Sequence, residues 1–175
     1  MIHTEFVTKL KGIASSPEFY KAHGLDQDLI NEIIEGYQIS KTSNSQPLIN
    51  DELLLLLENY DLTKTAIGMV EFVDKPYRND NRIFFGKFEV DDLVIDIPTG
   101  EVRCFESKST HLLWACAKSG GHFLSSLYEA ASFLEKRMLD NELYENEDIG
   151  QDVARYCAEL AGGNQYVDFY MTLFS

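Results

Sequence analysis

The stretch IFFGKFEVDDLVIDIPTGEVRCFE, residues 83–106, predicts the centre of the fold. It contains two runs rich in β-branched and aromatic residues, IFFGKFEV and LVIDI. We expect each run to be a strand, with Asp91 and Asp92 forming the turn between them. A second turn, PTGEV at 98–102, leads into the strand VRCF, and Gly100 can adopt the positive φ that such a turn uses. Consecutive strands with short links favour an antiparallel meander.

Strand-like composition continues on both sides of this stretch. AIGMVEFVD at 66–74 precedes it, and a turn is predicted at 77–82, YRNDNR. HLLWACA at 111–117 adds a strand after it. Residues 66–117 are therefore expected to form one antiparallel sheet of four to six strands.

Helical patterns occupy the chain before the sheet. Apolar residues recur at helical spacing from Thr4 to Ile13. Further helix starts are predicted where a side chain can cap a helix N-terminus. These side chains are Ser16, which is followed by Pro17, then Asp26, and Asn50 before the run Leu53–Leu57. The polar segment SKTSNSQP at 40–47 predicts an exposed loop.

Helical spacing returns after the sheet. Ser119 can cap a long helix whose apolar stripe runs from Phe123 to Met138. A further helical face ends at Gly162-Gly163, and the tail at 165–174 fits helical spacing better than alternation.

The order of helices, antiparallel sheet and helices predicts an α+β fold. We expect one domain over residues 1–175. Its parts are a helical N-terminal part at 1–60, the sheet at 66–117 and C-terminal helices at 119–175.

The charge balance narrows the classes of partner. The chain of 175 residues has 15 Lys and Arg against 29 Asp and Glu, a net charge of −14. Such a protein is repelled by nucleic acid and by anionic membranes, and it is steered towards basic partners. We therefore expect neither a nucleic-acid nor a membrane partner. The alternative is that the acidity serves solubility alone.

Cysteine usage and the apolar runs indicate the compartment. Cys104, Cys116 and Cys157 lie among apolar neighbours without a CxxC pair, which favours buried thiols in a reducing compartment. The N-terminal residues contain no apolar run of signal-peptide length. The longest apolar run, LLLLL at 53–57, is far shorter than the ~20 residues of a membrane span. A cytoplasmic protein is expected.

Carboxylates are the main candidates for chemistry. Adjacent Asp91 and Asp92 would face opposite ways in a strand but could converge in a turn, where with a histidine they would give a small hydrolase. Asp96 lies within the apolar run LVIDIP and is expected on the exposed face, where its charge costs least. No pattern places two carboxylates in different environments, as acid–base catalysis requires. We therefore expect no catalytic residues.

Motifs for metals, nucleophiles and phosphates are weak. The four histidines form no HxH or HxxxH pair, and the acidic stretch 89–96 lacks the spacing of a calcium loop, so no metal or other cofactor is expected. Cys116 with His122 would be a Cys–His pair, against the alternative of a buried thiol. KSGGH at 118–122 has glycines that could approach a phosphate at a helix start, but it is not a Walker loop. Trp114 is expected in the core or as a partner anchor on an edge strand.

The opening stretch, followed by LLWACAKSGGHFLSSLYEA, resembles the SUKH superfamily, which is named in part for a fungal regulator of cell-wall synthesis. The family pattern has a strand ending in Phe-Gly, an acidic turn, a strand into Asp-x-x-x-Gly-x-Val, and a later helix. The matching positions are Phe85-Gly86, Asp91-Asp92, Leu93, Ile95, Asp96, Gly100, Val102 and the helix from Phe123 to Leu127. The likeness covers residues 67–135, and the first 60 residues lack the Leu-Pro-x-x-Tyr-x-x-Phe motif of many members.

The resemblance implies an α+β fold in which a strongly bent antiparallel sheet packs against helices. It also implies a non-enzymatic role, because bacterial members look like immunity proteins that bind and neutralise polymorphic toxins, often nucleases. Nuclease active sites are basic, so an acidic protein can mimic the substrate and occlude the cleft. The expected partner is a basic toxin domain, and the alternative is a regulatory or scaffold protein.

We expect acidic residues beside the turns of the sheet to form the recognition surface. The predicted partner-binding residues are Asp74, Asp80, Glu89, Asp91 and Asp92. The open edges of a meander also leave a homodimer as an alternative to a monomer.

Overall fold

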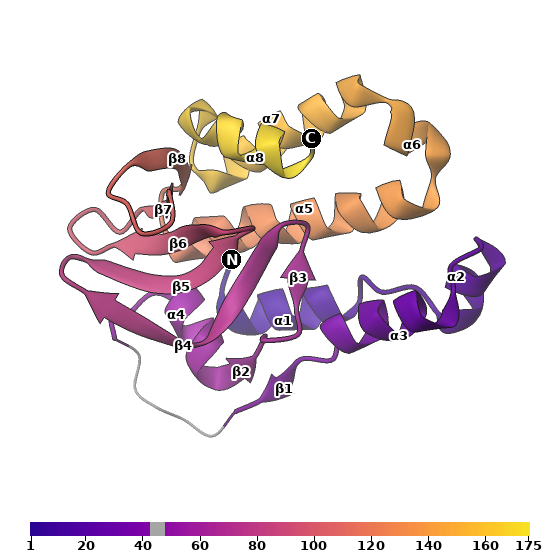
Figure 1. Cartoon of the computed structure of the whole chain (residues 1–175), viewed down its shortest axis with the longest axis horizontal. Coiled ribbons are helices and arrows are strands. Elements are labelled where there is room, and N and C mark those ends of the chain that lie inside the picture. The colour runs from indigo at the N-terminus through magenta and orange to yellow at the C-terminus, as the bar shows by residue number, and fades with distance from the viewer. Residues whose placement is uncertain (43–47) are drawn as a thin grey trace.

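A six-stranded antiparallel sheet, curled into a half-barrel, forms one part of the protein, and helices from both ends of the chain form the other (Figure 1). The computed structural model describes residues 1–42 and 48–175. Each strand of the sheet pairs with the next one along the chain. The predicted α+β class and the antiparallel meander are therefore confirmed.

The strands follow the sequence pattern closely. They are β3 Ala66–Ile67, β4 Val70–Asn79, β5 Arg82–Phe88, β6 Asp91–Asp96, β7 Val102–Phe105 and β8 Leu112–Ala117. Two short strands, β1 Ser40–Lys41 and β2 Tyr60–Asp61, pair separately. The predicted loop at 40–47 thus begins as a strand, and its residues 43–47 lie outside the described part of the chain.

The helices also follow the predicted order. Before the sheet lie α1 His3–Lys11, α2 Pro17–Ala22, α3 Gln27–Gly36 and α4 Glu52–Asn59. After it lie α5 Gly120–Leu139, α6 Asn141–Glu145, α7 Glu147–Ala161, a 3₁₀ turn η1 at Asn164–Tyr166, and α8 Val167–Leu173. The tail is helical, as expected. No helix in the described ranges is long and apolar enough to cross a membrane.

Most predicted helix caps are present, and one is displaced. Ser16, Asp26 and Ser119 each accept a hydrogen bond from the backbone N–H three residues later. The prediction of Asn50 as a cap is wrong, because Asp51 Oδ1 accepts from the Leu53 N–H at 2.9 Å. Asn and Asp are equally good caps, so adjacent candidates cannot be ranked by residue type.

Two predicted turns are shorter or shifted in the structure. The turn predicted at 77–82 is reduced to Asp80-Asn81, with Asp80 at φ 52°. The turn predicted at Asp91-Asp92 is wrong: Glu89-Val90 turns the chain, with Glu89 at φ 54°, and both aspartates lie in β6. Asp92 is opposite Lys87 in the ladder, and this opposite-charge pair favours the observed register.

One hydrophobic core includes residues from all three segments of the chain. Phe85 of β5 lies edge-on to Phe123 of α5, with ring centroids 5.9 Å apart. Phe88 contacts Trp114 and Phe169, at 5.6 and 5.1 Å between ring centroids. Leucines of α4 and apolar residues of α1 join the same cluster. Residues 1–60 therefore contribute to the core, and Trp114 is half-buried against it.

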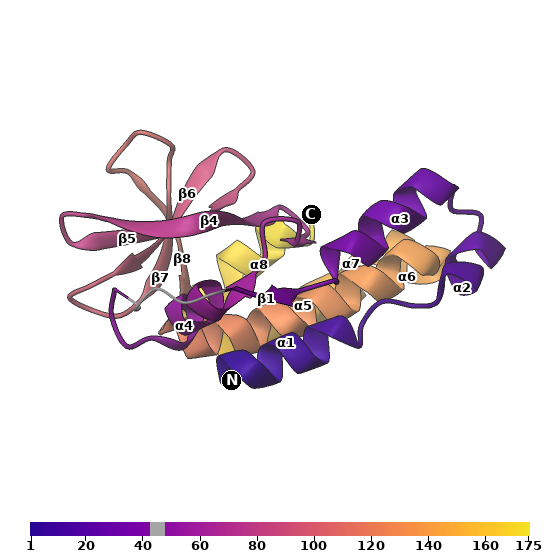
Figure 2. The same cartoon turned by 90° about the horizontal axis from the view of Figure 1, so that it is seen from below.

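Helices α2 and α3 are attached to this core more sparsely. Each buries only one side chain, Tyr20 in α2 and Ile30 in α3. Figure 2 shows both helices at one end of the molecule, far from the β4–β5 hairpin at the other end. Leu29 of α3 is 41% exposed, so the apolar face of this helix is only partly covered.

Candidate partner-binding surfaces

Three of the five predicted partner-binding residues are exposed on the sheet. Asp80 and Glu89 occupy the tips of the β4–β5 and β5–β6 turns, and Asp74 lies on β4 where its pairing with β5 is irregular. The two turns are at opposite ends of β5. At about 3.3 Å per residue, this seven-residue strand separates them by roughly 20 Å.

Asp91 and Asp92 are engaged within the sheet. Asp91 Oδ1 accepts a hydrogen bond from the Ser107 N–H at 3.0 Å, and Asp92 forms an ion pair and hydrogen bond with Lys87. As neighbours in a strand, they project to opposite faces of the sheet. The five predicted residues are therefore not brought together as one face, and the convergence that a hydrolase would need is missing from this pair.

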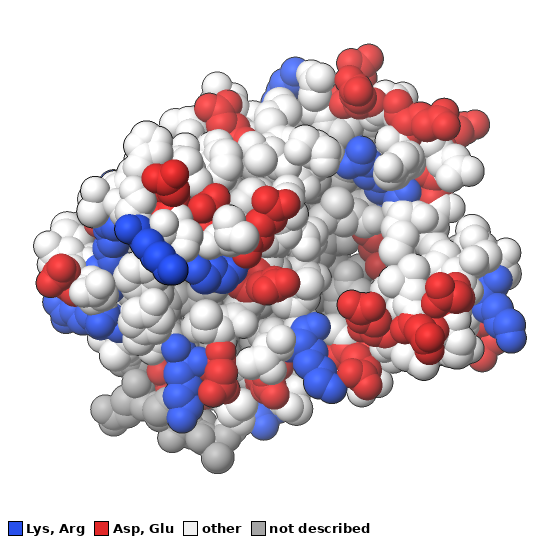
Figure 3. All heavy atoms as spheres, in the orientation of Figure 1, with Lys and Arg blue, Asp and Glu red and all other residues white. Residues whose placement is uncertain are grey.

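The negative charge is concentrated away from the sheet. Residues 66–117 contain nine acidic and six basic residues, a net charge of −3 out of −14. Of the 20 acidic residues elsewhere, 15 are exposed. Figure 3 shows red side chains gathered over the helical end, and red and blue side chains interspersed over the strands. The negative electrostatic field of the protein therefore arises mainly from the helices.

Four acidic side chains lie close together at the corner between α6 and α7. Its acids, Glu142, Glu145, Glu147 and Asp148, line a concave region of about 630 Å³ together with Asn146. All four are exposed, and no ion pair involves them in the described part of the chain. The exposed Tyr144 lies beside them, and tyrosine is a residue that often anchors protein interfaces.

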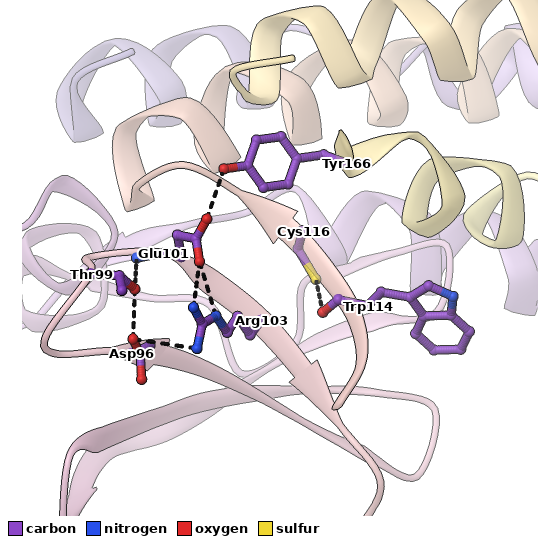
Figure 4. A network of polar contacts seen from close by, with 7 residues as sticks. All are labelled: Asp96, Thr99, Glu101, Arg103, Trp114, Cys116 and Tyr166. Atoms are coloured by element: carbon purple, nitrogen blue, oxygen red, sulfur yellow. Dashed lines mark hydrogen bonds and ion pairs between the residues drawn. The ribbon is translucent and has the colours of Figure 1, made fainter. Parts of the chain in front are cut away.

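A polar network joins the sheet to the C-terminal helices (Figure 4). Glu101 Oε2 accepts from Arg103 Nε and Nη2 at 3.0 and 2.6 Å, while its Oε1 accepts from the Tyr166 hydroxyl at 3.1 Å. Asp96 Oδ2 lies 3.4 Å from Arg103 Nη1 and accepts from Thr99 at 2.6 Å. Asp96, predicted to face solvent, is only 14% exposed because Arg103 covers it. The two carboxylates share one guanidinium, an arrangement that holds the β6–β7 turn in place.

Cys116, His122 and the KSGGH segment, which were only weak candidates for chemistry in the sequence, make internal contacts. Cys116 is buried and its thiol donates to the Trp114 carbonyl, while His122 Nδ1 lies 2.8 Å from Ser119 Oγ. Burial, followed by the charge of Lys118, lowers the pKa of His122. The first N–H of α5, that of Gly120 within KSGGH, donates to Asp51 Oδ2 at 3.1 Å. An internal carboxylate therefore fills the position that a phosphate would need.

Burial governs the remaining candidates for chemistry. Burial raises the pKa of the Cys104 and Cys157 thiols to about 12, and it raises the pKa of Cys116 well above the usual value. Thiols in this state are poor nucleophiles. Among residues 1–42 and 48–175, no group of three or more His, Cys, Asp or Glu side chains is placed to hold a metal ion.

Glu135 is a buried carboxylate that the sequence analysis did not single out. It is 8% exposed, and the Tyr20 hydroxyl donates a hydrogen bond to its Oε1. Glu135 lies four residues after Ala131 and eight after Leu127, so it continues the apolar stripe of α5. A charged residue within the apolar stripe of a helix is the sequence pattern by which this buried carboxylate could have been found.

Scans against protein-family models, curated proteins and solved structures find no match for this chain.

Proposed function

We propose that this chain is a non-enzymatic protein-binding module that recognises a basic partner, as an immunity protein does when it neutralises a toxin domain. The observation that carries the proposal is the net charge of −14, most of which lies on exposed side chains of the helical segments. Charge of one sign on this scale accelerates association with an oppositely charged protein and weakens association with nucleic acid.

Two further observations support this reading. The half-barrel sheet with flanking helices agrees with the fold that the SUKH resemblance implies, although a fold alone does not specify a function. The carboxylates, thiols and histidine considered for catalysis are engaged in internal hydrogen bonds or ion pairs. The competing proposals are a regulatory scaffold, in which acidity serves solubility, and a hydrolase, which no observed side-chain arrangement favours.

The experiment that tests the proposal is co-expression of the tagged chain with the product of the adjacent gene. The complex should survive purification at low salt, weaken at high salt, and suppress the activity of the partner. A basic nuclease as partner, inhibited in proportion to complex formation, is the expected result. Absence of a complex in both buffers, with monodisperse protein, would favour the scaffold.

Matched charge variants would locate the recognition surface. One triple variant neutralises the predicted sheet acids, Asp74→Asn, Asp80→Asn and Glu89→Gln. The other removes the same charge from the helical corner, Glu142→Gln, Glu145→Gln and Asp148→Asn. All six side chains are exposed, so both variants should fold. A larger loss of association rate in the first would support the sheet turns, and a larger loss in the second would place recognition on the helices.

A further inference from the structure

A groove separates α3 from the C-terminal half of α5. Figures 1 and 2 show the two helices side by side, and Figure 3 shows the surface hollowed between them. The groove has a volume of about 250 Å³. Its lining includes the apolar side chains Leu29, Ile33, Leu134 and Met138, with Glu32 and Glu135 as its acids. Leu29 and Met138 are 41% and 40% exposed, so the apolar walls are open to solvent.

The Glu135 carboxylate is the buried charge of this groove. Burial raises the pKa of Glu135. Tyr37, which also lines the groove, has its pKa raised to about 12 by burial and then by the charge of Glu135. Glu135 and Tyr37 both line the groove, and the charge of Glu135 is felt by the Tyr37 hydroxyl. The Tyr20 hydroxyl donates a hydrogen bond to Glu135, and the backbone N–H of Ser15 also acts on Glu135 and lowers its pKa.

No cation of the chain neutralises Glu135 within residues 1–42 and 48–175. Lys64, which borders the groove, is engaged by Glu35 at 2.9 Å. A buried carboxylate without a cationic partner is costly, and a cation supplied from outside would offset that cost. Glu135 also borders a wider cavity of about 580 Å³ beside α2, but Lys136 already places a cation there.

We propose that the α3–α5 groove receives a long basic side chain, lysine or arginine, from a protein partner. Its alkyl stem would lie on Leu29, Ile33 and Met138, and its cation would meet Glu135 with Glu32 at the rim. Lysine and arginine bury their stems along apolar surfaces in this way. The volume is also consistent with one side chain. Pockets for drug-sized ligands measure roughly 300–1,000 Å³, and this groove is smaller than that range. The inference rests on the proposed function in so far as the cation belongs to a basic partner protein.

The test uses n-butylguanidinium as the probe and the full chain carrying methyl labels. Saturable NMR shifts should appear at the Met138 and Leu29 methyl groups, with a Kd on the order of 1 mM for a ligand this small. Neutral n-pentanol should bind about tenfold more weakly, because it supplies the stem without the charge. Equal shifts with both probes, or none with either, would overturn the proposal.

Two variants measure separately what the Glu135 charge and the apolar wall around the alkyl stem contribute to binding. Glu135→Gln keeps an acceptor for Tyr20 and should abolish the preference for butylguanidinium over pentanol. Met138→Ser lies on an exposed position, so folding is not at stake, and it should weaken butylguanidinium binding severalfold when read at Leu29. Glu159→Gln, an exposed acid on α7, is the control of equal charge. Unchanged preference in Glu135→Gln would contradict the assignment of this carboxylate.

The groove and the proposed function can fail separately. If butylguanidinium does not bind while an adjacent-gene partner binds wild type and Glu135→Gln equally well, the groove is wrong and the protein-binding function stands. If the probe binds as expected but no protein partner is found, then no protein is known to supply the basic side chain, and the proposed function fails.

Discussion

The carboxylate of Asp51 accepts a hydrogen bond from the backbone N–H of Gly120 at 3.1 Å, although the two residues are 69 positions apart. Its other oxygen caps α4 through the Leu53 N–H. One side chain therefore completes the N-termini of two helices, α4 before the sheet and α5 after it. Negative charge at helix N-termini is favourable, which adds to both hydrogen bonds.

Asp51→Ala should destabilise the fold more than loss of an ordinary cap. It leaves the N–H groups of Leu53 and buried Gly120 without their acceptor, and we expect a loss of about 2–3 kcal/mol in the free energy of unfolding. Asp26→Ala, at the exposed single cap of α3, should cost about 1 kcal/mol. Urea unfolding monitored by circular dichroism measures both. Equal losses would mean that the second hydrogen bond contributes nothing.

Gly120 itself is required by the closeness of Asp51. A Cβ atom at this position would lie 1.9 Å from Asp51 Oδ1, so Gly120→Ala must displace the carboxylate or the helix. We expect a loss of about 1–3 kcal/mol, as for other overpacked sites. Gly150→Ala in α7 has no heavy atom within 4 Å of the added Cβ and should stabilise by about 0.5–1 kcal/mol. Thermal unfolding should separate the two variants in opposite directions from wild type.

These contacts show where sequence patterns stopped being informative. Ser16, Asp26 and Ser119 were predicted as caps because each acts on its own helix, within three residues. Asp51 joins segments far apart in the chain, and no local pattern contains that information. The same limit applies to Glu135, whose partner Tyr20 is 115 positions away.

The candidate site was predicted less well than the fold, for a related reason. Alternation and composition locate strands, and they identified every strand from β4 to β8. The choice between Glu89-Val90 and Asp91-Asp92 as the turn, two residues apart, depends on ladder partners such as Lys87. That shift moved Asp91 and Asp92 from an expected surface into the sheet. The acidic residues that lie close together in the sequence are therefore not gathered on one face of the folded protein.

The buried thiols should be inert in the folded protein. Burial raises the pKa of Cys104 and Cys157 to about 12, so almost no thiolate exists at neutral pH. A disulfide reagent such as DTNB should react with none of the three cysteines in buffer and with all three in denaturing urea. Rapid reaction of one thiol in buffer, absent from a Cys116→Ala variant, would instead revive the Cys116–His122 pair.

Glu135 should make folding stability depend on pH. Burial raises its pKa in the folded protein above the ordinary value of 4.5, so the folded state keeps a proton that the unfolded chain has released. The free energy of unfolding should therefore fall as the pH rises from about that value through the raised pKa. Glu135→Gln removes this titration and keeps an acceptor for the Tyr20 hydroxyl. We expect the variant to be more stable than wild type above this window, and the two to converge below it.

The matched control for this prediction is Glu159→Gln, which removes the same charge from an exposed position on α7. In a chain of net charge −14, any lost acid relieves some repulsion, and the control measures that general effect. Burial also raises the pKa of Asp51, so Asp51 adds a pH dependence of the same sign to the free energy of unfolding of all three proteins. This contribution cancels when the proteins are compared. Urea unfolding across the acid-to-alkaline range gives the curves. If Glu135→Gln tracks Glu159→Gln at every pH, the carboxylate is hydrated in the folded state, and the α3–α5 groove loses the buried charge on which its proposed ligand depends.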